Sequence, residues 1–295
     1  MANLIKGGFD MHCHAGPSLF DRDLDYVRAA EEAEAAGMKG IVIKDHLMPS
    51  AVALSILKTQ PEMLAKAPNV AVIGSICLNN HVGGFNPWAL ELALELGARV
   101  VWFPTVSSQR HIERHPGSLF GTLTTRDLKM ATPIQVLDES GAMVPEAIEC
   151  LELIAKYDAV LATGHMQAEH TLAVLPVARD RGVERIVITH PTLFVDADSA
   201  QRTQMINSGA FLEHEVGMYK AARPNGRQET SELIDLIKEH GSEHTILSSD
   251  LGQLNSPHPV NGMEGTAKAL VEANFSDTDI DRLFKTNAAQ LLGFS

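Results

Sequence analysis

Residues Gly40–His46 read GIVIKDH, a short apolar run that ends in a lysine, an aspartate and a histidine. Seven other runs rich in Val and Ile have a similar form, and longer segments with helical periodicity separate them. The eight runs are Gly8–His12, Gly40–His46, Val70–Leu78, Arg99–Thr105, Ala159–His165, Arg185–His190, Ala210–Val216 and Thr245–Asp250. Strands that are covered on both faces need such nearly continuous apolar cores. The alternation therefore predicts βα units and a parallel sheet.

Two of the segments between the runs carry helix signals at their ends. Leu24–Ala36 has apolar residues at helical spacing and stops at Gly37, and Pro145–Tyr157 opens with proline in its first turn. No GxGxxG motif follows the first run, and polar residues end most of the others. Within the α/β class, these features favour a (β/α)8 barrel of the TIM type over a doubly wound sheet.

The interval between the fourth and fifth runs is roughly double what the loops of a compact βα unit require. Residues 107–140 include the β-rich pieces Leu119–Thr125 and Pro133–Leu137, with turn residues around them. We expect an inserted hairpin here, after the fourth strand, that acts as a lid over the active site or as an assembly element. No linker or repeat marks a second domain, so residues 1–295 are predicted to form a single domain.

Composition describes an ordinary folded protein. Of the 295 residues, 45% are apolar and 21% are charged, which is enough apolar material for a large core. Acidic residues exceed basic ones by 37 − 24 = 13, so the net field repels phosphate backbones and anionic membrane surfaces. We expect neither a nucleic-acid partner nor a membrane partner.

The cysteines and the first residues predict the compartment. Cys13, Cys77 and Cys150 are too few and too far apart for a disulfide framework or a CxxC metal site. The start of the chain lacks the basic and apolar regions of a signal peptide, and no apolar run approaches about 18 residues. The sequence therefore predicts a cytoplasmic protein.

Histidines close several of the runs. In a TIM-type barrel the active site lies at the carboxyl ends of the strands. His12 and His14 follow each other at a spacing of two, so their side chains point to the same side, and His165, His190 and Asp250 end the fifth, sixth and eighth runs. A single histidine is as often a hydrogen-bonded core residue as a ligand, but five matched positions are hard to explain by packing. They predict a site for a divalent ion, first of all Zn²⁺, with one position open for water.

Four motifs extend this pattern over nearly the whole chain. They read DMHCHAGP, ATGH, ITHP and SSDLGQ, and they resemble the amidohydrolase superfamily of metal-dependent barrels. Together with IVIKDH they resemble a small branch of that superfamily that is known only as a domain of unknown function. The resemblance implies that His12, His14, His165, His190 and Asp250 hold one or two ions. It also implies that Asp250 takes a proton from the nucleophilic water.

One departure from the superfamily concerns the ligand between two ions. Many members carry a bridging lysine or glutamate on the fourth strand, but here Val100–Thr105 reads VVWFPT. Lys44, at the end of the second run, is the natural substitute, because a nearby dication favours its neutral amine, which can react with CO₂ to give a carbamate. The alternative is that Lys44 stays an ammonium and binds a carboxylate. His46 shares its face and either supports a ligand, contacts substrate or has a structural role.

Basic residues in the insertion bear on the substrate. Arg110 and Arg114 lie there in an otherwise acidic chain, and charge-assisted arginine contacts suit a small anionic substrate. Glu213, in the seventh run, could also reach it. The alternative for the arginines is a solvated hairpin or a subunit contact, and we expect a homo-oligomer.

We therefore expect a metal-dependent hydrolase that activates water to cleave an amide, cyclic amide, lactone or ester bond. One alternative is a metal-dependent decarboxylase or other lyase on the same barrel. A carbamate on Lys44 favours hydrolysis, whereas a single ion with Lys44 or Arg110 holding a carboxylate favours decarboxylation. Another alternative is a non-enzymatic barrel with a structural metal, which is poorly motivated because eight strands already bury a large core.

Overall fold

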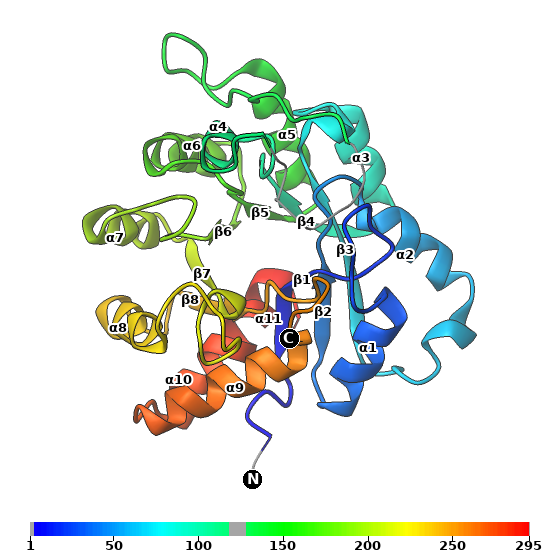
Figure 1. Cartoon of the computed structure of the whole chain (residues 1–295). Helices are drawn as coiled ribbons and strands as arrows, with labels where there is room; N and C mark the ends of the chain where they lie inside the picture. The colour runs from blue at the N-terminus through cyan, green and yellow to red at the C-terminus, as the bar shows by residue number, and fades with distance from the viewer. Residues whose placement is uncertain (1–2, 118–127, 295) are drawn as a thin grey trace. The chain divides into compact units, whose positions relative to one another are not determined.

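Eight strands form one sheet in the order in which they occur along the chain (Figure 1). The computed structural model describes residues 3–117 and 128–294. The strands are β1 (Phe9–Cys13), β2 (Gly40–Ile43), β3 (Ala71–Cys77), β4 (Ala98–Trp102), β5 (Val160–Ala162), β6 (Arg185–Thr189), β7 (Phe211–Glu215) and β8 (Thr245–Ser248). The pairs from β1 to β6 are all parallel. Each strand lies within one of the eight predicted runs, except that β1 ends one residue after its run and β4 begins one residue before its run.

Helices separate the strands. They are α1 (Tyr26–Ala35), α2 (Ser50–Lys58), α3 (Pro87–Glu95), α4 (Gln109–Arg114), α5 (Pro145–Lys156), α6 (Ala168–Asp180), α7 (Ser199–Asn207), α8 (Thr230–His240), α9 (Pro259–Glu272), α10 (Asp277–Asp281) and α11 (Asn287–Leu292). Short turns η1 (Pro61–Leu64), η2 (Asn80–Val82), η3 (Val216–Met218) and η4 (Arg282–Thr286) complete the set. Sequential parallel strands with intervening helices are the (β/α)8 topology, so the predicted fold class is confirmed. None of the described helices has the length and apolar character that crossing a membrane requires.

The chain divides into two compact units. The terminal unit comprises Met1–Lys44, Ala53–Ile73 and Glu213–Ser295, and the central unit comprises Asp45–Val52 and Gly74–Leu212. Each unit has an apolar core of its own. Neither unit is a continuous stretch of sequence, and the prediction of a single domain stays a prediction.

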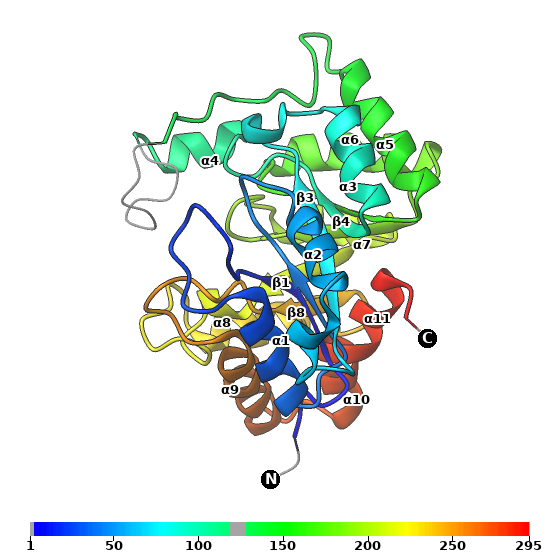
Figure 2. The same cartoon turned by 90° about the vertical axis from the view of Figure 1, so that its right-hand side faces the viewer.

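In the terminal unit, α1 lies beside α9 (Figure 2). The carboxylate of Asp25 caps α1 by accepting a hydrogen bond from the Arg28 amide at 2.8 Å. Past its other end stands Gly37, whose φ of 68° is the left-handed conformation that ends helices. His258, which precedes α9, hydrogen bonds through Nδ1 to the carboxylate of Glu32 on α1 at 2.8 Å. The predicted end of α1 at Gly37 is confirmed.

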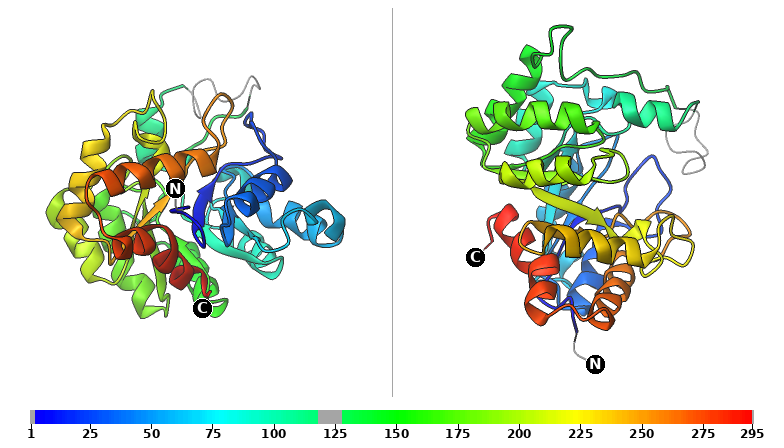
Figure 3. Two further views of the ribbon diagram at one scale, coloured as in Figure 1. Left: turned by 90° about the horizontal axis from the view of Figure 1, so that it is seen from below. Right: turned by 90° about the vertical axis from the view of Figure 1, so that its left-hand side faces the viewer.

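In the central unit, α5, α6 and α7 lie in a row along the strands (Figure 3). Pro145 occupies the first turn of α5, as predicted, because proline lacks only an N–H that a helix leaves unpaired there. The buried face of α5 consists of Ala147, Cys150, Leu151 and Ile154. These residues belong to the apolar core of the unit.

The polar residues that end the predicted runs lie just beyond the strands. Gly164, His190 and Asp250 follow β5, β6 and β8 with φ of 68°, 51° and 48°, so the backbone is left-handed at each point. This conformation costs a non-glycine residue roughly 1 to 2 kcal/mol. At His190 and Asp250 it ends the extended backbone, and the chain turns into the loops after β6 and β8.

The inserted segment departs in one respect from the predicted hairpin. Its first part contains the helix α4, whose start is capped by the Ser108 hydroxyl accepting from the His111 amide at 3.1 Å. A serine with this local hydrogen bond favours a helix start over a strand. Leu119–Thr125 lies outside the described residues, and Pro133–Leu137 has no strand assignment there. The hairpin and its role as a lid or assembly element stay predictions.

Gly164 provides a test of the turn that precedes His165. A Cβ atom at this position would lie 2.3 Å from the carbonyl oxygen of Phe103 and 2.6 Å from that of Pro104. We expect Gly164→Ala to lower the free energy of unfolding by about 3 kcal/mol or more, because strain and a backbone clash add. The matched control is Gly141→Ala, which has a φ of 83° and nothing within 4 Å and should cost only about 1 kcal/mol. Equal losses in urea denaturation would show that the close approach at Gly164 is unimportant.

Candidate metal centre

His12, His14 and Asp250 meet in the terminal unit. One carboxylate oxygen of Asp250, Oδ1, lies 3.3 Å from Nε2 of His12 and 2.9 Å from Nε2 of His14. All three residues are buried. The two imidazoles thus approach the same oxygen, as the alternation of side chains along a strand predicts.

The other nitrogen of each imidazole faces an oxygen that accepts hydrogen bonds. Nδ1 of His14 lies 3.0 Å from the backbone carbonyl oxygen of Lys44. Nδ1 of His12 faces carboxylate oxygens of Glu213 at 3.6 Å and Glu215 at 3.9 Å. The guanidinium of Arg22 also lies 3.4 Å from Nδ1 of His14. With a metal ion on Nε2, each Nδ1 would carry a hydrogen that these oxygens can accept. Carboxylates and carbonyls in this position orient metal-binding histidines in many proteins.

Asp10 joins β1 to β8 behind this cluster. Its Oδ1 accepts hydrogen bonds from the amides of Ser249 at 2.8 Å and His12 at 3.1 Å. Ser249 in turn donates its hydroxyl to the carbonyl oxygen of His12 at 3.0 Å, and the Asp250 amide donates to the same oxygen at 2.8 Å. Asp10 therefore fixes the backbone that carries His12 and Asp250.

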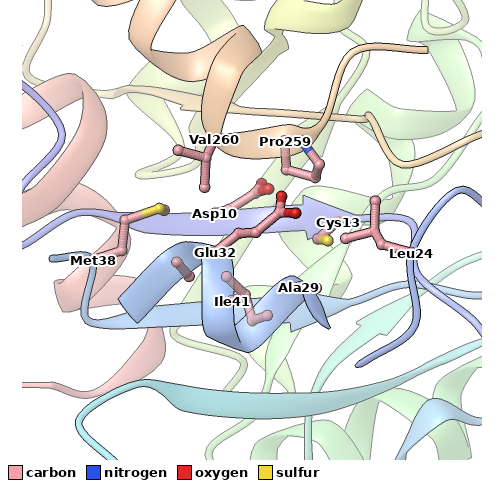
Figure 4. Close-up of a pocket in the computed structure, with 10 residues that line it drawn as sticks. Asp10, Cys13, Leu24, Ala29, Glu32, Met38, Ile41, Pro259 and Val260 are labelled. Atoms are coloured by element: carbon pink, nitrogen blue, oxygen red, sulfur yellow. The ribbon is translucent and has the colours of Figure 1, made fainter. Parts of the chain in front are cut away.

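Asp10 also borders a small pocket, which it lines together with Cys13 of β1, Glu32 of α1 and Pro259 of α9 (Figure 4). Its Oδ2 has no hydrogen-bond partner among the described residues, and burial raises the pKa of the carboxyl group. Cys13 is buried and belongs to the apolar core of the terminal unit. Asp10 thus acts on the site through the backbone rather than as a ligand.

Lys44 lies in the same cluster. Its side chain is fully buried, and Nζ lies 3.0 Å from Nε2 of His12. The amine and the Asp250 carboxylate therefore approach the same imidazole nitrogen. The predicted role of Lys44 as a bridging carbamate, or as an ammonium that binds a carboxylate, stays a prediction.

The charges in the cluster oppose one another. Burial and Lys44 both lower the pKa of His12, but Asp250 and Glu213 outweigh them and raise it to about 9. Burial, assisted by Arg22, lowers the pKa of His14 to about 3. Burial would raise the pKa of Asp250, yet His12 and His14 hold it well below its ordinary value. The carboxylate is therefore ionised, and His14 is neutral near pH 7.

The neutral His14 has a single N–H and three polar neighbours. Oδ1 of Asp250 faces its Nε2, whereas its Nδ1 faces both the carbonyl oxygen of Lys44 and the guanidinium of Arg22. A cation between Nε2 of His14 and the carboxylate would leave Nδ1 its hydrogen for the carbonyl oxygen of Lys44. The donor set of nitrogen and oxygen atoms suits a borderline divalent ion such as Zn²⁺.

His165 and His190 meet in the central unit. Their ring centroids are 5.3 Å apart in an edge-on arrangement, and both side chains are buried. Phe194, in the loop after β6, stacks on His165 with centroids 3.9 Å apart and planes 4° from parallel. The rings of these two predicted ligands therefore lie together, with an aromatic wall on one side.

His46 belongs to the same unit and is held by a polar network. Its Nδ1 hydrogen bonds to the hydroxyl of Thr105 at 2.8 Å, and its ring lies 5.9 Å from that of His165. Asn79 donates to the carbonyl oxygen of His46 at 2.8 Å and to the Thr105 hydroxyl at 2.7 Å. The Asn79 carbonyl accepts from the amides of Thr105 at 2.9 Å and Ser107 at 3.0 Å. Asn79 thus fixes the loops after β2 and β4.

The arginines of the inserted segment already have an acidic partner. Arg110 pairs with the carboxylate of Asp196, and Arg114 lies 3.2 Å from the same oxygen. Two guanidinium groups share one carboxylate, so one positive charge is left uncompensated by this partner. The expected role of both arginines in binding an anionic substrate stays a prediction.

The predicted site residues fall into two groups. His12, His14, Lys44, Glu213 and Asp250 lie together in the terminal unit, and His46, His165 and His190 lie together in the central unit. That all the predicted ligands bind the same metal centre stays a prediction.

Four further residues contact these clusters. They are Arg22 and Glu215 in the terminal unit and His111 and Phe194 in the central unit. The signal for His111 is its spacing of four from His115, which places two imidazoles on one face of a helix. Glu215 shares its face of β7 with Glu213, so strand alternation places both on the same side. Arg22 and Phe194 carry no such signal.

A family model described as "Family of unknown function (DUF6282)" matches residues 7–213. The sequence matches no curated protein. The match agrees with the predicted resemblance to a branch of unknown function.

Solved structures with a similar fold include three from Pseudomonas. An amidohydrolase from Pseudomonas aeruginosa is 8% identical with a TM-score of 0.63, and the alignment covers 98% of this chain and 96% of that one. The probable dipeptidase PvdM of the same organism is 13% identical with a TM-score of 0.62 and the same coverage. A putative 2-pyrone-4,6-dicarboxylic acid hydrolase from Pseudomonas putida is 15% identical with a TM-score of 0.54, covering 98% of both chains. At such identities the likeness shows that the chain has an amidohydrolase-type fold.

The Asn79 network yields a second prediction. Asn79→Ala removes the partner of two buried amides, those of Thr105 and Ser107, and of the carbonyl oxygen of His46. We expect the free energy of unfolding to fall by about 3 kcal/mol, because each buried group left unpaired costs roughly 1 to 3 kcal/mol. Asn207→Ala, at an exposed position near the end of α7, should stay within about 0.5 kcal/mol. A similar small change for both variants in urea denaturation would contradict the role given to Asn79.

Proposed function

This chain belongs to the family of unknown function DUF6282, and from its site we propose that it is a metal-dependent hydrolase that activates water against a small substrate. The observation that carries the proposal is the approach of two histidine Nε2 atoms to one carboxylate oxygen of Asp250. Both imidazoles have their Nδ1 atoms turned toward acceptors, which is the arrangement that prepares Nε2 for a metal. The hydrolases among the similar structures support this reaction class.

We assign the metal to nitrogen and oxygen donors at the strand ends. His12, His14 and Asp250 supply three of them, and the proposal extends the set to His165 and His190, which follow β5 and β6. These positions lie at the carboxyl ends of strands, where barrels of this class place their active sites. Zn²⁺ is the ion that best suits such a set, and either one or two ions would serve.

A divalent cation bound there lowers the pKa of water toward about 7 and polarises a carbonyl group. Asp250 accepts the proton of the attacking water and can return it to the leaving group, because its carboxylate is ionised and adjoins both imidazoles. Glu213 and the carbonyl of Lys44 keep His12 and His14 in their orientation. His190 holds a second ion or, with one ion, donates a hydrogen bond to the attacked oxygen.

The substrate we propose is small, with an amide, cyclic amide, lactone or ester bond. Arg110 and Arg114 are candidates for holding an anionic group on it, since Asp196 offers one carboxylate to two guanidinium groups. His46 and Glu213 are further candidates for substrate contact. The three cysteines are free and buried, which agrees with the proposed cytoplasmic location, and a homo-oligomer stays part of the proposal.

The role of Lys44 distinguishes the proposed hydrolase from a second candidate. Its buried amine points at Nε2 of His12, where it can add to CO₂, forming an N–C bond and releasing one proton. The resulting carbamate would hold a second ion beside the first. If Lys44 instead keeps its ammonium, it is placed to bind a substrate carboxylate beside a single ion, which suits a decarboxylase.

The first test of this function is metal content. Protein purified without chelators should contain about one or two divalent ions per chain. His12→Ala combined with His14→Ala should lose the ion and the activity together, while circular dichroism stays unchanged, because the apolar cores do not include these residues. The matched control combines His81→Ala with His170→Ala and should keep both. Elemental analysis that finds no metal in fully active protein would contradict the proposal.

The reaction class is tested on the same preparations. A panel of lactones, esters, amides and cyclic amides, each with and without a carboxylate, should include substrates that release acid only with metal-loaded protein. Release of CO₂ from carboxylate compounds, without hydrolysis of any panel member, would instead favour the decarboxylase.

Lys44 gives a separate prediction. If it is carbamylated, Lys44→Ala should lose the second ion, and short carboxylic acids should partly restore activity by replacing the carbamate oxygens. Lys44→Arg serves as the control, because it keeps the positive charge and cannot form the carbamate. Electron density that ends at an unmodified amine, in crystals grown with bicarbonate and holding two ions, would exclude the bridge.

A further inference from the structure

Two side chains from outside β5 hold the ring of His165. Phe194 covers one face of the ring, with the planes 4° from parallel. His111, on α4 of the inserted segment, approaches its edge, and the two Nδ1 atoms are 3.1 Å apart. Both histidines are 1% exposed, so bulk water is excluded from this contact.

The geometry identifies this contact as a hydrogen bond between imidazoles. The centroids of the two rings are 5.2 Å apart and the planes differ by 22°, whereas the nitrogens are only 3.1 Å apart. The two Nδ1 atoms therefore lie on facing edges and point at each other. Two ligands of one ion would instead direct their lone pairs at a third point between them. One nitrogen must donate and the other must accept.

Residues of the inserted segment fix His111 in its turn. Its amide donates to the hydroxyl of Ser108 at 3.1 Å, which caps α4. The ring of His115 stacks on that of His111 with centroids 4.3 Å apart, and Nδ1 of His115 hydrogen bonds to the carbonyl oxygen of His111 at 3.1 Å. His111 is thus held by its backbone and by one face, with its Nδ1 directed at His165.

We propose that His111 is a positioning residue for His165: it accepts the Nδ1 hydrogen of His165, fixes that tautomer and leaves Nε2 of His165 with the lone pair that binds the ion. The inference rests on the proposed function, in which His165 is a ligand. Metal-binding histidines usually donate their other ring N–H to an acceptor, and loss of that acceptor typically weakens metal binding 10- to 100-fold. In this protein the acceptor is an imidazole rather than a carboxylate or a carbonyl.

The inserted segment would contribute to the proposed site through His111. His111 comes from α4, so the segment after β4 supplies the partner of a residue that follows β5. Two arginines near His111 in the sequence, Arg110 and Arg114, pair with Asp196. Asp196 lies in the loop that also contains Phe194. The ion pairs and the imidazole contact therefore hold α4 against the same region.

Two substitutions separate the hydrogen bond from the packing. His111→Phe keeps an aromatic ring between His115 and Phe194 but removes Nδ1, while His111→Asn places an amide near the position of Nδ1 and gives up the ring. His170→Phe is the control, because it makes the same exchange at a half-buried imidazole of α6 that contacts Gln167. Each variant is compared with the wild type by Zn²⁺ titration of chelator-treated full-length protein. The tautomer of His165 is followed in parallel by ¹⁵N NMR, with the signal assigned from His165→Ala.

We expect His111→Phe to weaken Zn²⁺ binding about 10- to 100-fold, and His111→Asn to restore most of that loss. His170→Phe should bind Zn²⁺ as the wild type does. In the metal-free wild type, His165 should carry its hydrogen on Nδ1, and in His111→Phe the form with hydrogen on Nε2 should gain population. Equal Zn²⁺ affinities for wild type and His111→Phe, or equal losses in the Phe and Asn variants, would overturn the proposal.

The two readouts distinguish the failure of this inference from the failure of the proposed function. If the wild type binds no divalent ion, the proposed function is wrong, but the ¹⁵N spectrum still reports whether His111 sets the tautomer of His165. If the wild type binds Zn²⁺ and the tautomer of His165 does not change in His111→Phe, only the positioning role is wrong.

Discussion

The strand ends of the terminal unit are built around two buried imidazoles, those of His12 and His14, that approach one carboxylate oxygen of Asp250. Asp250 can stay ionised away from water only because His12 and His14 adjoin it, since an isolated buried charge is far too costly. Its left-handed backbone adds a further cost. Asp10 offsets that cost because its carboxylate accepts hydrogen bonds from the amides of His12 and Ser249, which hold the ends of β1 and β8 together. The backbone is thus arranged around a charge cluster rather than around an apolar contact.

The same cluster separates the two sides of each imidazole. On the Nδ1 side, Glu213 and the carbonyl of Lys44 are acceptors that come from β7 and from just after β2. On the Nε2 side, a carboxylate and an amine compete for one nitrogen of His12. The Nδ1 contacts orient the imidazoles, and the Nε2 atoms face the groups to which the proposed reaction assigns a role. The proposed ion would lie on the Nε2 side, where the carboxylate of Asp250 approaches both imidazoles.

In the central unit, aromatic rings rather than carboxylates orient the histidine His165. His165 is stacked on Phe194 and meets His111 edge to edge, so its orientation depends on the loop after β6 and on α4. His46 is fixed instead by Thr105 and the Asn79 network. Few acidic groups are needed here, because neutral imidazoles can hydrogen bond to hydroxyls and to one another. The inserted segment contributes directly to this arrangement.

The sequence by itself determined the eight strands, the barrel topology and the strand-end residues, because apolar runs and their closing His and Asp residues are local patterns. It also predicted that His12 and His14 share a side, which follows from strand alternation. Only the tertiary structure decided which acceptor each imidazole meets. Glu213 beside His12, His111 against His165, and Asp196 pairing with both arginines join residues 54 to about 200 positions apart. No local pattern encodes such pairings, since they depend on how loops from different strands are brought together.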